Sequence, residues 1–121
     1  RTCGDSALFC MGISKTYEIA RQAGYPVIRE FYADRDYDRS GSIVFARQVA
    51  RPKPEEVAAK CVRACKEGLV RTIDGKDIEI EFESICFHSD TPGALDMGKA
   101  IRAGLTEAGI KIAPASTMLG L

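Results

Sequence analysis

The chain has 121 residues, a length that suits one domain or a piece of a larger one. Seventeen basic residues balance seventeen acidic ones, so no field of one sign is expected, and nucleic acid and anionic membranes are poor candidate partners. Apolar residues form 45% of the chain. None of their runs approaches the roughly 18 residues that a membrane-spanning helix requires.

The beginning of the chain predicts two strands that flank a helix. Residues 6–11 are a short apolar run and a candidate buried strand, and a helix is expected over residues 14–24. Ser14 can cap that helix and Gly24 can end it. Residues 25–33 are the next predicted strand.

A polar, turn-rich loop over residues 34–52 separates this part from a second helix. Residues 43–46 are a candidate short strand within the loop. The helix is expected over residues 54–68, where Pro54 suits the first turn and Gly68 the end.

The last third of the chain predicts a hairpin, a strand and a helix. The hairpin is expected over residues 70–82, and residues 83–87 are a buried-strand candidate. The helix should cover residues 91–109, with Thr91 as its N-cap. The tail, residues 110–121, begins with a strand-like pattern.

Because strands and helices mostly alternate, we expect an α/β fold with a parallel sheet of about four strands and a small hairpin. That amounts to half a barrel or a small open sheet. No repeat or linker divides the chain, so residues 1–121 are expected to form a single domain or a half-barrel fragment.

The five cysteines do not suggest a disulfide framework, because their number is odd and their spacing irregular. They are Cys3, Cys10, Cys61, Cys65 and Cys86. Each lies among apolar or small residues, where a free thiol acts as a small hydrophobe. We therefore expect a reducing compartment, the cytoplasm. Cys61 and Cys65 share one helical face, but a zinc site needs about four ligands and the chain has one histidine.

The single histidine follows a predicted strand directly and precedes a helix. In parallel α/β folds, ligands bind where strands end and loops lead into helices, and His88 lies at such a point. Asp90 could orient the imidazole or take a proton itself, and Thr91 could hold an anion. Two other interpretations stay open: Asp90 or Thr91 only caps the helix, or Cys86 is a nucleophile served by His88.

A second cluster of polar residues follows the strand predicted at residues 25–33. Asp34 and Arg35 lie at the strand end, with Glu30 before them and Tyr37 after them. The carboxylate and the guanidinium can form a structural pair. Arg35 can equally bind a substrate carboxylate while Asp34 acts as a base or a metal ligand.

These two stretches together resemble the lactam-utilisation (LamB/YcsF) family. The first family motif corresponds to Glu30, Phe31, Tyr32, Ala33, Asp34, Arg35 and Tyr37. The second corresponds to Ile85, Cys86, His88, Ser89, Asp90, Thr91, Pro92, Gly93 and Ala94. Arg47 matches a basic position in the intervening loop.

The resemblance implies an irregular, TIM-like β/α barrel similar to the polysaccharide deacetylases. Motifs that family members carry in their first half are absent here, so the chain resembles the C-terminal half only. Half a barrel would expose sheet edges and apolar faces. We therefore expect association with a partner or with a second copy.

The resemblance also implies a role as the A subunit of a 5-oxoprolinase. Such an enzyme opens 5-oxo-L-proline to L-glutamate with ATP as co-substrate and with subunits B and C. The candidate catalytic residues are His88, Asp90 and Asp34, and the candidate substrate-binding residues are Arg35, Thr91, Tyr37 and Arg47. The resemblance leaves open whether the site binds a metal.

Two alternatives belong to other functional classes. A metal-dependent hydrolase or deacetylase on a related barrel would bind a divalent metal near His88 and Asp90 and would need no ATP. A non-catalytic half-domain would act only in assembly and would show no turnover alone.

Overall fold

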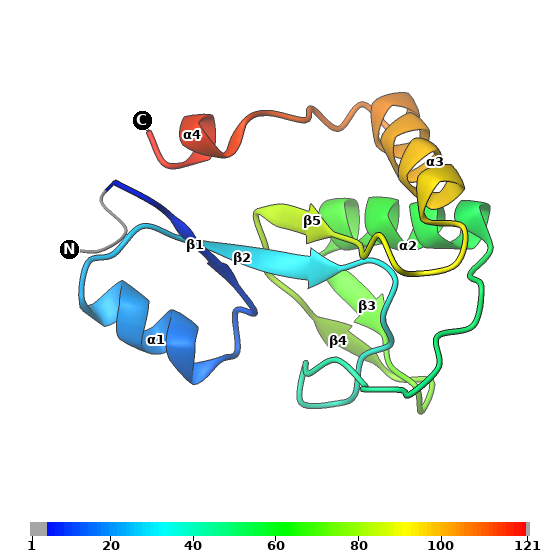
Figure 1. The fold of residues 1–121 in the computed structure, drawn as a ribbon, viewed down its shortest axis with the longest axis horizontal. Helices are drawn as coiled ribbons and strands as arrows, with labels where there is room; N and C mark the ends of the chain where they lie inside the picture. Colours follow the sequence, from blue (N-terminus) through cyan, green and yellow to red (C-terminus); the bar gives the residue numbers. More distant parts are fainter. Residues whose placement is uncertain (1–4, 121) are drawn as a thin grey trace.

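A computed structural model describes residues 5–120, so Cys3 lies outside the described residues. Three strands form a parallel sheet in the order β1-β2-β5 (Figure 1), and they are β1 (Leu8–Cys10), β2 (Val27–Tyr32) and β5 (Ser84–Cys86). Strands β3 (Leu69–Arg71) and β4 (Asp77–Glu79) pair separately as an antiparallel hairpin. The expected α/β class with parallel strands and a small hairpin is confirmed.

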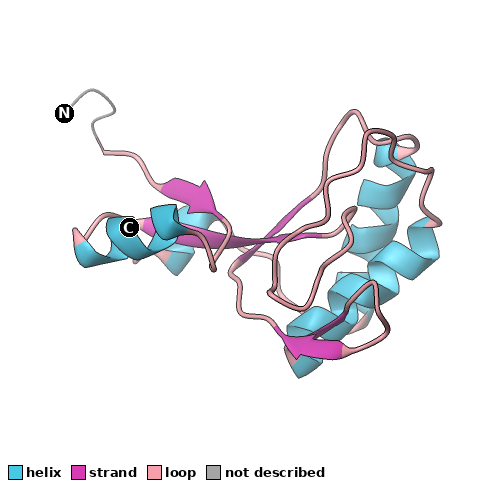
Figure 2. Ribbon diagram, turned by 90° about the horizontal axis from the view of Figure 1, so that it is seen from below, coloured by secondary structure: helices cyan, strands magenta, loops and turns pink. Residues whose placement is uncertain are grey.

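The helices are α1 (Lys15–Gln22), α2 (Pro54–Glu67), α3 (Ala94–Glu107) and the short α4 (Ala115–Met118). Figures 1 and 2 show α2 and α3 together at one end of the molecule, with α1, β1 and α4 at the other. Across residues 5–120, every helix is too short or too polar to cross a membrane.

Two of the predicted helix ends are confirmed, because local chemistry specifies them. The side chain of Ser14 accepts a hydrogen bond of 3.1 Å from the backbone N–H of Tyr17 and so caps α1. Gly68 closes α2 in the left-handed conformation, at φ 66°, which glycine adopts without steric cost.

The predicted start of α3 was wrong. The helix begins at Ala94 after Gly93, which adopts φ 77°, and Thr91 does not cap it. The hydroxyl of Thr91 instead donates to Asp34, 57 positions earlier in the chain. A long-range hydrogen bond has therefore replaced the local cap that the sequence favoured.

Two strand predictions were also wrong. Residues 43–46 contribute only an isolated bridge between Tyr37 and Ile43, and Phe45 is 86% exposed. The tail from residue 110 runs as coil into α4. The described part of the chain thus has three parallel strands rather than about four, because neither segment finds a neighbouring strand to complete its hydrogen bonds.

The core lies between β2, α2 and α3. Phe31 stacks on Tyr37 and Phe82 at centroid distances of 5.5 and 5.0 Å, and Phe31 and Met97 are fully buried. Each such side chain contributes about 1.5–3 kcal/mol to folding. The helices approach closely at Gly104, where an added Cβ would lie 3.2 Å from the Cβ of Ala58. This core holds the carboxyl ends of β2 and β5 in place.

Candidate active site

Parallel pairing brings two distant polar residues together. Tyr32 of β2 is in register with Cys86 of β5, and the N–H of Ala33 continues the ladder to the carbonyl of Cys86 at 2.9 Å. Asp34 and His88 each follow two residues after those strand ends. The register therefore places them side by side at one edge of the sheet, where α/β folds bind ligands.

The Asp34 carboxylate is the centre of the site, and its side chain is fully buried. It accepts the backbone N–H of His88 at 3.0 Å and the hydroxyl of Thr91 at 2.5 Å. Its Oδ1 atom lies 2.9 Å from Nδ1 of His88. A buried carboxylate needs several donors to offset its desolvation, and this one has them.

These donors control the ionisation of Asp34. Burial by itself raises its pKa, whereas the hydrogen bonds from Thr91 and from the backbone and ring of His88 lower it. The net effect is a pKa below the usual value for aspartate. Asp34 is therefore an anion at neutral pH, suited to holding a neighbouring imidazole rather than to taking a proton.

The His88 imidazole is fixed by Asp34 on one side and reachable on the other. An ionised carboxylate only accepts hydrogen bonds, so Nδ1 of His88 must carry the proton that it donates. The Nε2 atom of neutral His88 then has a free lone pair, and the side chain remains 33% exposed. The ring of Tyr32 stacks on the imidazole at 6.1 Å. This is the arrangement of a general base with an orienting carboxylate.

Arg35 and Thr91 both contact the Asp34 carboxylate. The Nη1 atom of Arg35 lies 3.4 Å from Oδ2 of Asp34 and 3.3 Å from the Thr91 hydroxyl, which is itself buried. The expected pair of Asp34 and Arg35 is thus present as a structural contact. The Nε and Nη2 atoms of Arg35 form no hydrogen bond with residues 5–120.

Tyr37 does not line the site. Its side chain is 1% exposed, and its hydroxyl accepts the backbone N–H of Tyr32 at 2.9 Å. Burial raises the pKa of Tyr37 to about 12. The predicted contact with substrate is therefore replaced by a supporting role behind β2.

Two other predicted site residues are exposed. Asp90 lies on the turn after His88, and Arg47 lies in the loop before α2. Neither side chain forms a hydrogen bond or ion pair within the part of the chain that the structure describes. The carboxylate that orients the imidazole is Asp34, not Asp90.

The cysteines do not form a second reactive centre. Burial raises the pKa of Cys86, so its thiol is neutral and a poor nucleophile. Cys61 is fully buried in the core, as expected. Within residues 5–120, no group of three or more histidine, cysteine or acidic side chains is arranged to hold a metal.

Lys60 is a site residue that the sequence reasoning missed. Its Nζ atom donates to the carbonyl oxygens of Arg35 at 2.5 Å and Ala33 at 3.4 Å, and it lies 5.6 Å from the ring centres of Phe31 and Tyr37. Burial lowers its pKa. The sequence pattern that could have identified Lys60 is its position on the apolar face of α2, which also carries the buried residues Val57, Cys61 and Ala64.

The chain is similar to proteins of one known family over almost its whole length. The family model described as "LamB/YcsF family" matches residues 2–120. A 5-oxoprolinase A subunit from Pseudomonas aeruginosa is 59% identical over 105 residues, which are 87% of this chain and 42% of that protein. A 5-oxoprolinase A subunit from Pyrococcus abyssi is 35% identical over 120 residues, 93% of this chain and 45% of that protein.

The crystal structure of a lactam utilization protein from Thermus thermophilus has a similar fold, with a TM-score of 0.81 and 28% sequence identity. The superposition covers 92% of this chain and 45% of that one. The chain thus spans less than half the length of the relatives that it matches. The family match over residues 2–120, together with the similarity to these relatives, shows that the chain belongs to the LamB/YcsF family.

Proposed function

We propose that this chain is part of the A subunit of a 5-oxoprolinase and that it contributes the His88–Asp34 pair to the opening of 5-oxo-L-proline. The hydrogen bond of 2.9 Å between His88 and buried Asp34 carries the proposal. The names of the relatives support the choice of substrate. In this proposal residues 1–121 form one unit of a larger β/α barrel that works in the cytoplasm.

In the proposed mechanism, Nε2 of His88 accepts and returns a proton at the reacting amide. Asp34 holds the Nδ1 proton and stabilises the imidazolium that forms when Nε2 takes up a proton. The free guanidinium atoms of Arg35 bind the substrate carboxylate. Asp90 and Arg47 are both exposed loop residues and remain further candidates for contact with the substrate.

A lactam amide resists hydrolysis, so its opening requires activation of the carbonyl. We propose that ATP, as co-substrate of an assembly with subunits B and C, transfers its γ-phosphoryl group to the amide oxygen and leaves as ADP. Water then adds to the activated carbon, the ring C–N bond breaks, and inorganic phosphate is released. No residue of this chain is assigned to the nucleotide, and the proposed steps of His88 and Asp34 do not depend on where it binds.

The test measures 5-oxoproline-dependent ATP hydrolysis by the chain mixed with subunits B and C. The His88→Ala variant should lose at least about 100-fold in rate, the usual contribution of a general base. The Cys86→Ala variant is the matched control, since it changes the same strand end and should retain activity. Equal loss in both variants would point to structural damage, and full activity of His88→Ala would refute the assignment.

A further inference from the structure

The turn that carries Asp34 is held from outside the site by a lysine of α2. The Nζ atom of Lys60 donates to the carbonyl oxygen of Arg35 at 2.5 Å and to that of Ala33 at 3.4 Å. These carbonyls belong to the two residues that flank Asp34. Across residues 5–120 neither of them accepts a backbone N–H group, so Lys60 supplies their hydrogen bonds.

The ammonium group of Lys60 is fixed by aromatic side chains as well. It lies 5.6 Å from the ring centroids of both Phe31 and Tyr37, two buried rings that stack on each other. A cation at about this distance is attracted to the face of an aromatic ring. Phe31 comes before the turn and Tyr37 after it, so the chain contacts the same charge on both sides of Asp34.

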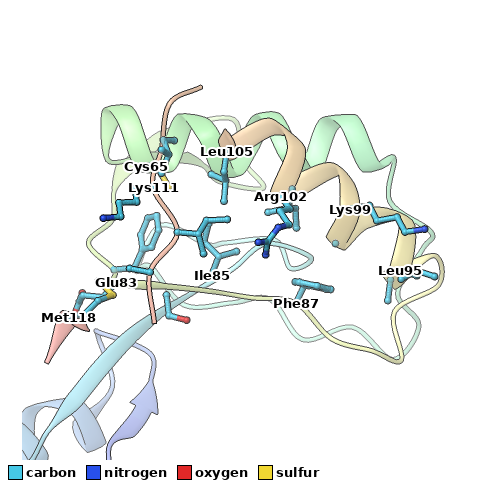
Figure 3. Close-up of a pocket in the computed structure, with 18 of the residues that line it drawn as sticks. Cys65, Glu83, Ile85, Phe87, Leu95, Lys99, Arg102, Leu105, Lys111 and Met118 are labelled. Atoms are coloured by element: carbon cyan, nitrogen blue, oxygen red, sulfur yellow. The ribbon is translucent and has the colours of Figure 1, made fainter. Parts of the chain in front are cut away.

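The helix that carries Lys60 is anchored in the core. Cys61, the next residue, is fully buried. About one turn further on, Cys65 lines an apolar groove together with Leu105 of α3 and Ile85 of β5 (Figure 3). These contacts tie α2 to both α3 and the sheet. The helix therefore holds the ammonium group at a fixed place relative to the strands that lead into the site.

We propose that Lys60 is a positioning residue for the His88–Asp34 pair. Lys60 fixes the turn, the turn fixes the carboxylate, and the carboxylate fixes the tautomer and the direction of the imidazole through the contact of 2.9 Å. A displacement of about 1 Å at a catalytic group can cost on the order of 100-fold in rate. The inference rests on the proposed function for its effect on catalysis, whereas its effect on the imidazole does not depend on the reaction.

The first measurement is the ¹⁵N spectrum of His88, the only histidine of the chain. Lys60→Met keeps the apolar stem and removes the donor, so the single Nδ1–H tautomer should become a mixture of the two tautomers. Lys66→Met is the matched control for the loss of a lysine from α2, at an exposed position. Ser14→Ala is the control for lost stability, because it removes the cap of α1 at the other end of the molecule (Figure 1). Both controls should keep the single tautomer.

The second measurement is the 5-oxoproline-dependent ATP hydrolysis of the chain with subunits B and C. Lys60→Met should lower kcat at least about ten-fold, because the carboxylate that orients the base is displaced. Ser14→Ala and Lys66→Met should retain kcat. When Lys60→Met is combined with Asp34→Asn, it should cause little further loss, because Lys60 acts through Asp34 and the two effects are not additive.

All spectra are recorded in trimethylamine N-oxide, which favours the folded state, so that weakened variants are compared in folded form. An unchanged tautomer in folded Lys60→Met, or an equal change in Ser14→Ala, would overturn the proposal. A Lys60→Met chain that stays unfolded would overturn it too, by assigning Lys60 to folding alone. If the tautomer changes as expected while the unchanged chain does not turn over 5-oxoproline, the positioning role stands and the proposed function fails.

Discussion

The Nδ1 atom of His88 lies 2.9 Å from Oδ1 of Asp34, although the two residues are 54 positions apart in the chain. The backbone N–H of the same histidine also donates to the same carboxylate. This double contact fixes both the position and the tautomer of the imidazole. It leaves Nε2 as the atom that can exchange a proton with a ligand.

The tautomer can be observed directly, because His88 is the only histidine of the chain. Above the pH at which the ring becomes neutral, we expect the ¹⁵N spectrum to show a protonated Nδ1 and a bare Nε2. In the Asp34→Asn variant, the spectrum should shift towards a mixture of the two tautomers, because the anionic acceptor is lost. Asp90→Asn is the control and should leave the spectrum unchanged. A shift in that variant instead would assign the orienting role to Asp90.

The stability of the fold should depend on the ionisation of Asp34. Its pKa is lower in the folded chain than the ordinary 3.8, so ionised Asp34 stabilises the fold above that pH. This contribution disappears as the pH falls through the folded pKa. Asp34→Asn should cost about 1–3 kcal/mol at pH 7 by loss of charge-assisted hydrogen bonds. The difference from the unchanged chain should shrink at about pH 3, as measured by urea unfolding at both pH values. If the free energies of unfolding of Asp34→Asn and the unchanged chain differed equally at both pH values, the stabilisation would not come from ionised Asp34.

Lys60 should stabilise the turn that carries Asp34. Replacing it with methionine keeps the apolar stem but leaves the carbonyl oxygens of Ala33 and Arg35 without their donor. We expect a loss of about 1–3 kcal/mol in the free energy of unfolding, measured by urea titration. Lys66→Met, at an exposed position of the same helix, should change it by less than about 0.5 kcal/mol. Similar effects of the two substitutions would show that the buried ammonium has no special role.

The contact of α2 with α3 should be intolerant of bulk at Gly104. An added Cβ there would already lie 3.2 Å from Ala58, so Gly104→Leu must force the helices apart. Overpacking of this kind costs about 1–3 kcal/mol. Ala103→Leu, exposed on the same helix, is the control and should change the stability by less than about 0.5 kcal/mol, because leucine is nearly as good a helix former as alanine. The melting temperatures of the two variants are compared by thermal unfolding. An unchanged melting temperature for Gly104→Leu would contradict the close contact of α2 with α3.

The prediction from sequence succeeded where neighbouring residues decide the structure. Ser14 caps α1 and Gly68 ends α2, because a cap depends on side chains and backbone angles within one turn. Asp34 and His88 were recognised as candidates from their place after predicted strands. The strand-like patterns at residues 43–46 and at the beginning of the tail were misleading, since a strand forms only where another strand is available to pair with it.

The sequence by itself thus determined the order of helices and strands and the residues available for chemistry. Only the tertiary structure decided how those residues are used. The register of β2 against β5 places the His88 imidazole in contact with Asp34 rather than with the nearby Asp90. Thr91 donates its hydroxyl to the same carboxylate instead of capping α3. Packing of α2 against β2 buried Tyr37 and brought Lys60 behind the site. These contacts join residues 25 to 57 positions apart, and their choice depends on the free energy of the whole core rather than on any local pattern.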